Sequence, residues 1–261
     1  MTRWPYPRIV AHRGGGKLAP ENTLGAIRFG AALGFQGVEF DVMLARDGTP
    51  VLIHDETLKR TTGRRGRVAN TDFETLRTLD AGAWRGRRWR GERIPSLFAA
   101  GALCRELGLW ANIEIKPATG HARATGAAVA RMARELWRDA AAAPLLSSFS
   151  LDALLAARRA APELPRGWLV GRVPKNWRET LAALEGVALH CHHRALTPLL
   201  ADEIHAAGYA LLCWTVNDRR TARKLLRWGV DCLVTDALKR IGPAFAAPAA
   251  RRRLWRRVWP K

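Results

Sequence analysis

The sequence predicts an α/β fold, a TIM (β/α)8 barrel with a small insertion between strands 2 and 3. Eight short apolar runs alternate with segments that have helical start and stop signals, as expected of consecutive parallel β/α units. The length of 261 residues suits one such barrel, and a hydrophobic fraction of 48% is ample for its core.

The eight predicted strands are apolar along most of their length. Strands buried on both faces have this character, because helices cover one face and the barrel core the other. The strands are expected over residues 8–12, 37–43, 109–116, 144–150, 167–171, 186–192, 209–216 and 230–236.

Helix signals stand between these runs. Pro20 and Glu21 suit the start of a helix, and Gly34 stands just past its expected end. Ser150 and Thr197 stand where N-caps of later helices are expected.

One connection, residues 43–110, is much longer than the others. It holds an Asp-Gly turn between two extended pieces and then a basic, Trp-containing stretch, which predicts a β-hairpin extension and a small insertion over one barrel end. We expect a barrel domain over 1–245 and a basic C-terminal tail over 246–261. That tail is either solvated or in weak contact with an anionic membrane.

The net charge of +20 is unusual for a soluble domain. Such a surface attracts phosphate-bearing ligands and polyanions, although an Arg-rich solvated surface is an equally simple reading. Four well-separated cysteines form no CxxC pair, which favours a reducing compartment. No signal peptide or apolar membrane span is apparent, so a cytoplasmic location is expected.

The stretch "HRGGG" (12–16) follows the first strand directly, so His12 and Arg13 are expected at the C-terminal face of the barrel, where active sites of this fold are built. Glycines let backbone N–H groups approach an anion, and a guanidinium binds phosphate as a fork. The alternative is a core histidine followed by an ordinary glycine turn.

Carboxylates alternate with apolar residues on two predicted strands. Glu39 and Asp41 share one face of the second strand, and Glu114 and Lys116 share one face of the third. Three carboxylates in a barrel interior need a positive partner, and oxygen-only ligation suits Mg²⁺ or Ca²⁺. A structural salt bridge is the alternative reading. Lys116 would offer a point charge to a phosphate oxygen.

His54 ends a strand-like run shortly after the second strand. Two imidazoles, His12 and His54, over one metal centre can divide general acid and general base roles. His54 could instead be a surface residue paired with Asp55. Trp214, at the end of the seventh strand, either walls a substrate cleft or fills the core, and Asn217 is placed to cap the next helix.

The cluster "LHCHH" holds His190, His192 and His193. No carboxylate or cysteine accompanies these histidines at zinc-site spacing, so polar residues near the end of a strand are the favoured reading.

In this order, the motifs resemble the glycerophosphodiester phosphodiesterase family over roughly residues 8–240: "HRG…PENT", "EFDV", "DGTPVLIHDETLKRTT", "IEIK", "SFS", "WTVN" and "GVDCLVTD". The resemblance implies a TIM barrel that hydrolyses glycerophosphodiesters to glycerol 3-phosphate and an alcohol with a divalent cation. The family's last strand often continues T-D-x-P, whereas this chain has "TDAL".

The resemblance also implies roles for individual residues. The catalytic histidines of the family fall on His12 and His54, and its phosphate-contacting residues fall on Arg13 and Lys116. The metal ligands of the family fall on Glu39, Asp41 and Glu114.

Two other functions remain open at this stage. A lysophospholipase D on the same barrel is suggested by the basic, Trp-bearing tail. A nucleic-acid binder is suggested only by the net charge, and it leaves the three carboxylates unexplained, so no nucleic-acid partner is expected.

Overall fold

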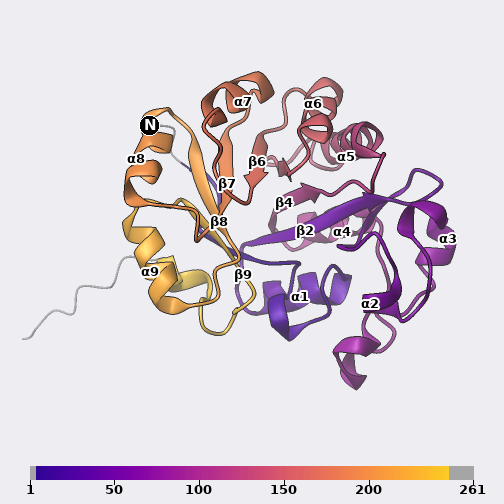
Figure 1. Ribbon diagram of the computed structural model, residues 1–261. Coiled ribbons are helices and arrows are strands. Elements are labelled where there is room, and N and C mark those ends of the chain that lie inside the picture. The colour runs from indigo at the N-terminus through magenta and orange to yellow at the C-terminus, as the bar shows by residue number, and fades with distance from the viewer. Residues whose placement is uncertain (1–3, 247–261) are drawn as a thin grey trace, which may run out of the picture.

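A closed barrel of eight parallel strands forms the centre of the protein in a computed structural model that describes residues 4–246 (Figure 1). Each strand pairs in parallel with the next, and β1 pairs with both β2 and β9, which closes the ring. This confirms the TIM barrel. The strands are β1 (Ile9–Ala11), β2 (Gly37–Leu44), β4 (Trp110–Ile115), β5 (Leu145–Ser148), β6 (Arg166–Val170), β7 (Ala188–His192), β8 (Ala210–Trp214) and β9 (Cys232–Thr235).

Seven helices surround the strands among the described residues (Figure 1). They are α1 (Leu24–Ala32), α4 (Leu97–Glu106), α5 (Ala122–Leu136), α6 (Leu151–Ala160), α7 (Trp177–Leu184), α8 (Pro198–Ala206) and α9 (Arg219–Arg227). The predicted caps Ser150 and Thr197 both accept a backbone N–H in the first turn of their helices. Asp218, rather than Asn217, caps α9.

The first helix begins later than the sequence suggests. Thr23 is its N-cap and accepts from the N–H of Ala26, so Pro20 and Glu21 precede the helix. Asn22 takes a left-handed conformation (φ 58°). The backbone turn before α1 therefore delivers Glu21 and Asn22 to the barrel mouth instead of burying them in a helix.

The predicted hairpin is confirmed. β3 (Pro50–Leu52) runs antiparallel to the end of β2, with Leu44 opposite Pro50. Short helical turns follow: α2 (Lys59–Thr62), η2 (Val68–Asn70), α3 (Phe73–Leu76), η3 (Ala83–Arg85) and η4 (Arg87–Trp89).

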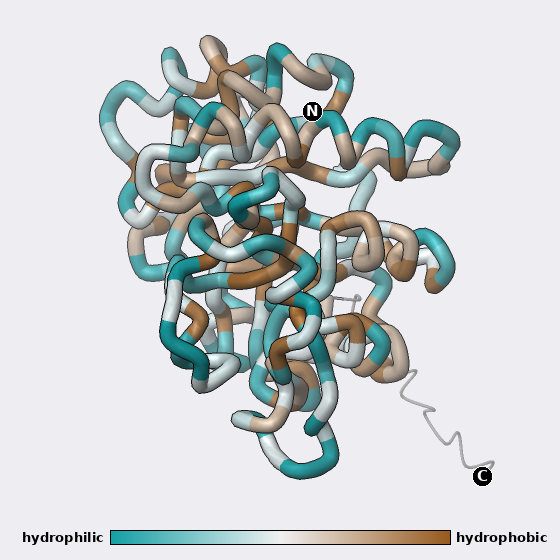
Figure 2. Tube along the Cα trace, turned by 90° about the vertical axis from the view of Figure 1, so that its right-hand side faces the viewer, coloured by the Kyte–Doolittle hydropathy of each residue, from teal (hydrophilic) through white to brown (hydrophobic). Residues whose placement is uncertain are grey.

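This insertion has a small core of its own that includes Met43, Val51 and Leu76. In Figure 2 the outermost loops of the insertion are largely hydrophilic. Helix α4, inside the range predicted as insertion, packs on the barrel like the other outer helices.

The barrel interior is apolar at its base and polar toward the carboxyl ends of the strands. The apolar part is a cluster that includes Val10, Leu145, Leu212 and Cys232. Strand register places the polar residues Glu39, Ser147 and His190 in one layer with Val234 above this base. Buried polar groups are costly, so a polar layer inside a barrel indicates a site.

Two further expectations concern the ends of the chain and membranes. In the described part of the chain, none of the helices combines the length and apolar character that a membrane span requires. The predicted tail falls almost entirely within 247–261 and lies outside the described residues.

Candidate active site

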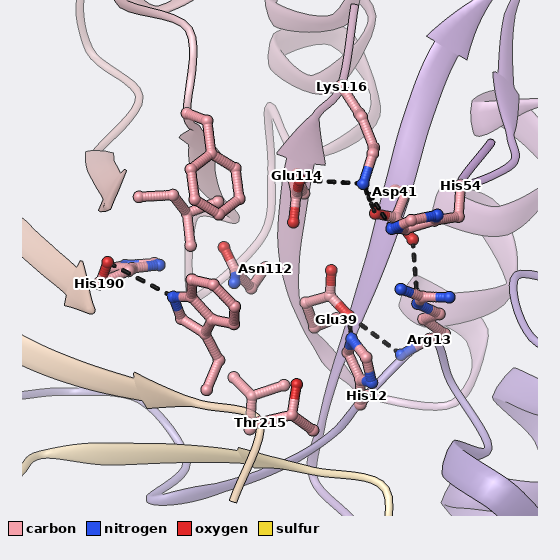
Figure 3. Close-up of a pocket in the computed structure, with 14 residues that line it drawn as sticks. His12, Arg13, Glu39, Asp41, His54, Asn112, Glu114, Lys116, His190 and Thr215 are labelled. Atoms are coloured by element: carbon pink, nitrogen blue, oxygen red, sulfur yellow. Dashed lines mark hydrogen bonds and ion pairs between the residues drawn. The ribbon is translucent and has the colours of Figure 1, made fainter. Parts of the chain in front are cut away.

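A pocket of about 110 Å³ opens at the carboxyl ends of the strands (Figure 3). All eight residues singled out in the sequence line it. They are His12, Arg13, Glu39, Asp41, His54, Glu114, Lys116 and Trp214. They come from β1, β2, β4, β8 and the segment after β3, so the barrel brings together groups as far apart in sequence as residues 12 and 214.

The three carboxylates form the floor of the pocket. One oxygen of each of Glu39, Asp41 and Glu114 lies within 4.8 Å of the others, and Glu39 and Asp41 are at most 4% exposed. Burial, followed by repulsion from Asp41, raises the pKa of Glu114 well above its usual value. Burial also raises the pKa of Glu39 to about 7 despite the His12 imidazole nearby.

Asp41 is the carboxylate that the protein keeps ionised. Its Oδ2 accepts a hydrogen bond from the Asn22 side chain (2.8 Å) and lies 3.4 Å from Nε of Arg13. Nζ of Lys116 is 3.6 Å from its other oxygen. Burial opposes ionisation, but the surrounding cations and the Asn22 hydrogen bond lower the pKa of Asp41 below its usual value.

Arg13 is held by an ion-pair chain that sequence reasoning missed. Its Nη1 donates to Glu21 (2.7 Å), which also accepts two hydrogen bonds from Arg60. Arg60 in turn donates to Asp55 beside His54. Glu21 and Arg60 both belong to motifs quoted above, but their pairing could not be predicted from the sequence, because the two residues lie 39 positions apart.

His12 is paired with a residue from the opposite end of the chain. Its Nδ1 lies 2.5 Å from Oδ1 of Asp236, and its Nε2 lies 3.8 Å from Glu39. Asn217 donates to the other oxygen of Asp236 (3.0 Å) instead of capping α9. Burial alone would lower the pKa of His12, but the hydrogen bond to Asp236 and the charge of Glu39 raise it above its usual value.

His54 has a contrasting environment. Its Nδ1 bonds to Asp55 (2.7 Å), and its Nε2 accepts from Nζ of Lys116 (2.5 Å). A Lys116 donor at Nε2 favours the neutral Nδ1–H form of the ring. Burial, opposed by Asp41, lowers the pKa of His54. The predicted pairing with Asp55 is therefore present, but at the rim of the pocket rather than on an unrelated surface.

Close packing explains why glycines follow Arg13. A Cβ on Gly16 would come within 2.5 Å of the backbone oxygen of Asp236, and one on Gly14 within 2.9 Å of the Ile27 nitrogen. The backbone N–H groups of Arg13, Gly14 and Gly16 all donate within the protein. These three N–H groups have protein acceptors, and the backbone approach to an anion expected from the sequence stays a prediction.

The side of the pocket opposite Arg13 is apolar. Trp214 meets Phe149 edge to face at 5.4 Å, and Leu169 lines the same wall. His192 and His193 stack near the mouth, as expected of residues at the end of a strand. His190 lies deeper and is fully buried, and burial lowers its pKa to about 3.

The residues present fit a divalent cation. Three carboxylates at this separation repel one another, and an oxygen-only donor set suits a hard cation. Asn112, next to Glu39 in the barrel register, has a buried side-chain oxygen without a hydrogen-bond partner among the described residues. A polar occupant of the pocket would satisfy that oxygen.

Fold and site together define the class of protein. It is a TIM-barrel enzyme, with two imidazoles, two basic side chains and a carboxylate cluster suited to a metal at the carboxyl ends of its strands. The chain belongs to the glycerophosphoryl diester phosphodiesterase family, whose sequence pattern matches residues 12–240. This confirms the resemblance drawn from the motifs.

Individual relatives agree. A glycerophosphodiester phosphodiesterase of Caldanaerobacter subterraneus is 34% identical over 230 residues, which cover 87% of this chain and 93% of the relative. An Oleispira antarctica phosphodiesterase, solved with the product sn-glycerol-3-phosphate, is 37% identical with a TM-score of 0.84 over 89% of this chain and 94% of its own. A glycerophosphodiester phosphodiesterase of Agrobacterium tumefaciens is 28% identical with a TM-score of 0.76, covering 93% and 100%.

Proposed function

We propose that the protein hydrolyses glycerophosphodiesters to glycerol 3-phosphate and an alcohol. The observation that carries this proposal is the convergence of the carboxylate cluster with His12, His54, Arg13 and Lys116 in one pocket. The similar Oleispira antarctica enzyme, with sn-glycerol-3-phosphate bound, supports the choice of substrate class.

Glu39, Asp41 and Glu114 would hold one divalent cation, Mg²⁺ or Ca²⁺. When bound, that cation supplies positive charge to the phosphoryl oxygens and orients the reacting groups. Arg13 and Lys116 line the same pocket and stabilise the negative charge that grows at phosphorus. Glu21 fixes the guanidinium of Arg13 in place, so little reorganisation is needed when the diester binds.

The different partners of the two histidines support different roles. His12, hydrogen-bonded to Asp236 and close to Glu39, favours the protonated state and serves as the general acid that donates from Nε2 to the leaving oxygen. His54 is held neutral with Nδ1 on Asp55, so Nε2 can accept a proton from the nucleophile once Lys116 turns to the phosphate. Asp236 is a positioning residue that fixes the tautomer of His12.

The nucleophile is either water or the 2-hydroxyl of the glycerol half. A 2-deoxy substrate separates the two routes, because normal turnover excludes a cyclic phosphate.

Trp214 walls the substrate cleft, together with Phe149. The four cysteines are all unpaired and buried, in keeping with the reducing, cytoplasmic location that we propose. The lipid-directed alternative rests on the basic tail outside the described residues. Turnover of lysophosphatidylcholine in preference to glycerophosphocholine would support that alternative.

The central test is a metal-titrated assay of glycerol 3-phosphate release. The chelated protein should be inactive, Mg²⁺ or Ca²⁺ should restore activity, and Glu114→Gln should lose both activity and cation binding while remaining folded. Undiminished turnover by Glu114→Gln at low metal concentration would remove the proposed cation site.

A further inference from the structure

A second pocket, of about 360 Å³, opens on the other side of His12 and Arg13. It shares those two residues with the catalytic pocket, so a ligand there lies next to the reacting phosphate. Beyond them, it is lined by Gly16, Lys17, Glu21, Trp84, Arg85 and Asp236. Trp84 and Arg85 belong to the insertion, on η3, so the two pockets meet where the insertion approaches the barrel mouth.

The acidic groups of this second pocket already have partners. Asp236 bonds to His12 and Asn217, and Glu21 bonds to Arg13 and Arg60. Neither carboxylate is available to attract a cation.

Two basic residues of the second pocket, Lys17 and Arg85, have no charged partner among the described residues. The side chains of Lys17 and Arg85 are exposed, and neither takes part in an ion pair or side-chain hydrogen bond within residues 4–246. Two uncompensated positive charges therefore face a ligand in this pocket.

Trp84 gives the pocket a fixed apolar wall. The side chain is 44% exposed, and its indole N–H donates to the carbonyl of Ala81 (2.8 Å). Asp80 holds the surrounding loop by accepting from the N–H groups of Gly82, Ala83 and Gly91. Trp84 and Arg85 are thus presented on a tied loop, which lowers the cost of ordering them around a ligand.

The two pockets differ in a way that suits the two arms of a phosphodiester. The catalytic pocket is small and walled by Phe149, Leu169 and Trp214, which suits one arm of constant size. The second pocket is larger and open to solvent, which suits an arm of variable size. Arg13, shared by both, lies at the junction where the phosphate would sit.

We propose that the alcohol half of the substrate binds between Lys17, Trp84 and Arg85, and that this subsite selects alcohols that carry a further anionic group, a phosphate or carboxylate. This inference rests on the proposed function and adds a specificity to it. Arg85 can bind such an anion as a fork and Lys17 as a point charge, while Trp84 covers the apolar face of the alcohol.

A cationic alcohol such as choline is the natural competitor. The face of Trp84 alone would attract a quaternary ammonium group. The charges of Arg85 on the same turn and of Lys17 across the pocket oppose this, because like charges at an exposed site disfavour binding. Whether the protein prefers diesters of anionic or of cationic alcohols is therefore a direct test of this subsite.

The experiment uses the metal-loaded protein and a matched pair of substrates, glycerophosphoinositol and glycerophosphoinositol 4-phosphate, which differ by one phosphate. The ratio of their kcat/KM values should favour the phosphorylated diester by about three- to tenfold. The double variant Lys17→Gln/Arg85→Gln should lose most of this preference and gain turnover of glycerophosphocholine. Arg131→Gln, an exposed arginine on α5, is the control for overall charge and should keep the wild-type ratio.

Three outcomes overturn the subsite: equal kcat/KM for the matched pair, a preference for glycerophosphocholine, or an unchanged ratio in the double variant. An equal loss in Arg131→Gln would also overturn it, since the preference would then come from the whole surface. Failure to release glycerol 3-phosphate from any diester would instead reject the proposed function itself, and the subsite with it.

Discussion

Glu39→Gln should make the metal-free protein more stable at neutral and alkaline pH. Glu39 is 4% exposed, and burial raises its pKa to about 7, so ionising it in the folded protein is unfavourable. Gln has nearly the same shape and keeps an acceptor for the N–H of Arg13, which donates to Glu39 over 3.0 Å. The substitution therefore removes the charge and little else.

The magnitude follows from the pKa difference. The pKa of Glu39 rises from a usual 4.5 to about 7, and one pKa unit corresponds to about 1.4 kcal/mol, which gives about 3 kcal/mol. Between these two pH values the folded protein binds the proton and the unfolded chain does not. Stability therefore falls as pH rises through this window. The variant should gain about 3 kcal/mol at pH 8 and almost nothing at pH 4.5.

Urea unfolding in the presence of EDTA, at several pH values between 4.5 and 8, measures this difference. Saturating Mg²⁺ or Ca²⁺ should reverse the order, because the cation stabilises the wild type and binds poorly to the variant. Glu163→Gln, at an exposed position outside the site, is the matched control and should change stability little at any pH. A Glu39→Gln protein less stable than wild type at pH 8 without metal would refute the argument that burying the ionised Glu39 carboxylate destabilises the folded protein.

Three other predictions concern the histidines. His12→Gln and His54→Gln should each lower kcat by about a hundred- to ten-thousand-fold. The two losses should not add when both substitutions are combined. With a p-nitrophenyl diester, which needs no acid, only the His12 loss should shrink, and equal losses on both substrates would contradict the assigned roles. Asp236→Asn should lower the pKa of His12 and so move the alkaline limb of the pH–rate profile to lower pH. An unmoved limb would contradict the claim that Asp236 raises the pKa of His12. The wild-type folded protein keeps His190 neutral below pH 6.5 while its unfolded chain takes up a proton, so acid destabilises the fold. His190→Leu should therefore weaken the fall of the unfolding free energy with decreasing pH, measured by urea unfolding, by about 1.4 kcal/mol per pH unit. An unchanged dependence of the unfolding free energy on pH would contradict this.

Most of the barrel was predictable because its signals are local. Each strand is a short apolar run, and each predicted strand overlaps one of the eight in the ring. The caps Ser150 and Thr197 act within three residues of themselves. The start of α1 was misplaced because Pro20 and Glu21 imitate a first helical turn, whereas Thr23 makes the capping hydrogen bond.

The carboxylate cluster could also be predicted from the sequence, for a geometric reason. Residues two apart on a strand face the same side, so Glu39 and Asp41 had to point into the barrel together. The register of β2 with β4 then places Asp41 opposite Glu114. By the same rule Asn112, two residues before Glu114, faces the barrel interior, but only the register shows that it lies beside Glu39.

The different environments of the two histidines, on which the proposed roles rest, could not be predicted from the sequence, because each ring has one partner that is distant in sequence. His12 meets Asp236, which lies 224 residues away, and His54 meets Lys116, which lies 62 residues away. The hydrogen bond to Asp236 and the charge of Glu39 outweigh burial and raise the pKa of His12, whereas burial, with smaller contributions from Arg13 and Lys116, lowers the pKa of His54. Closure of the barrel thus gives two identical side chains the different environments on which we base their proposed acid and base roles, since β1 pairs with β9 where Asp236 meets His12.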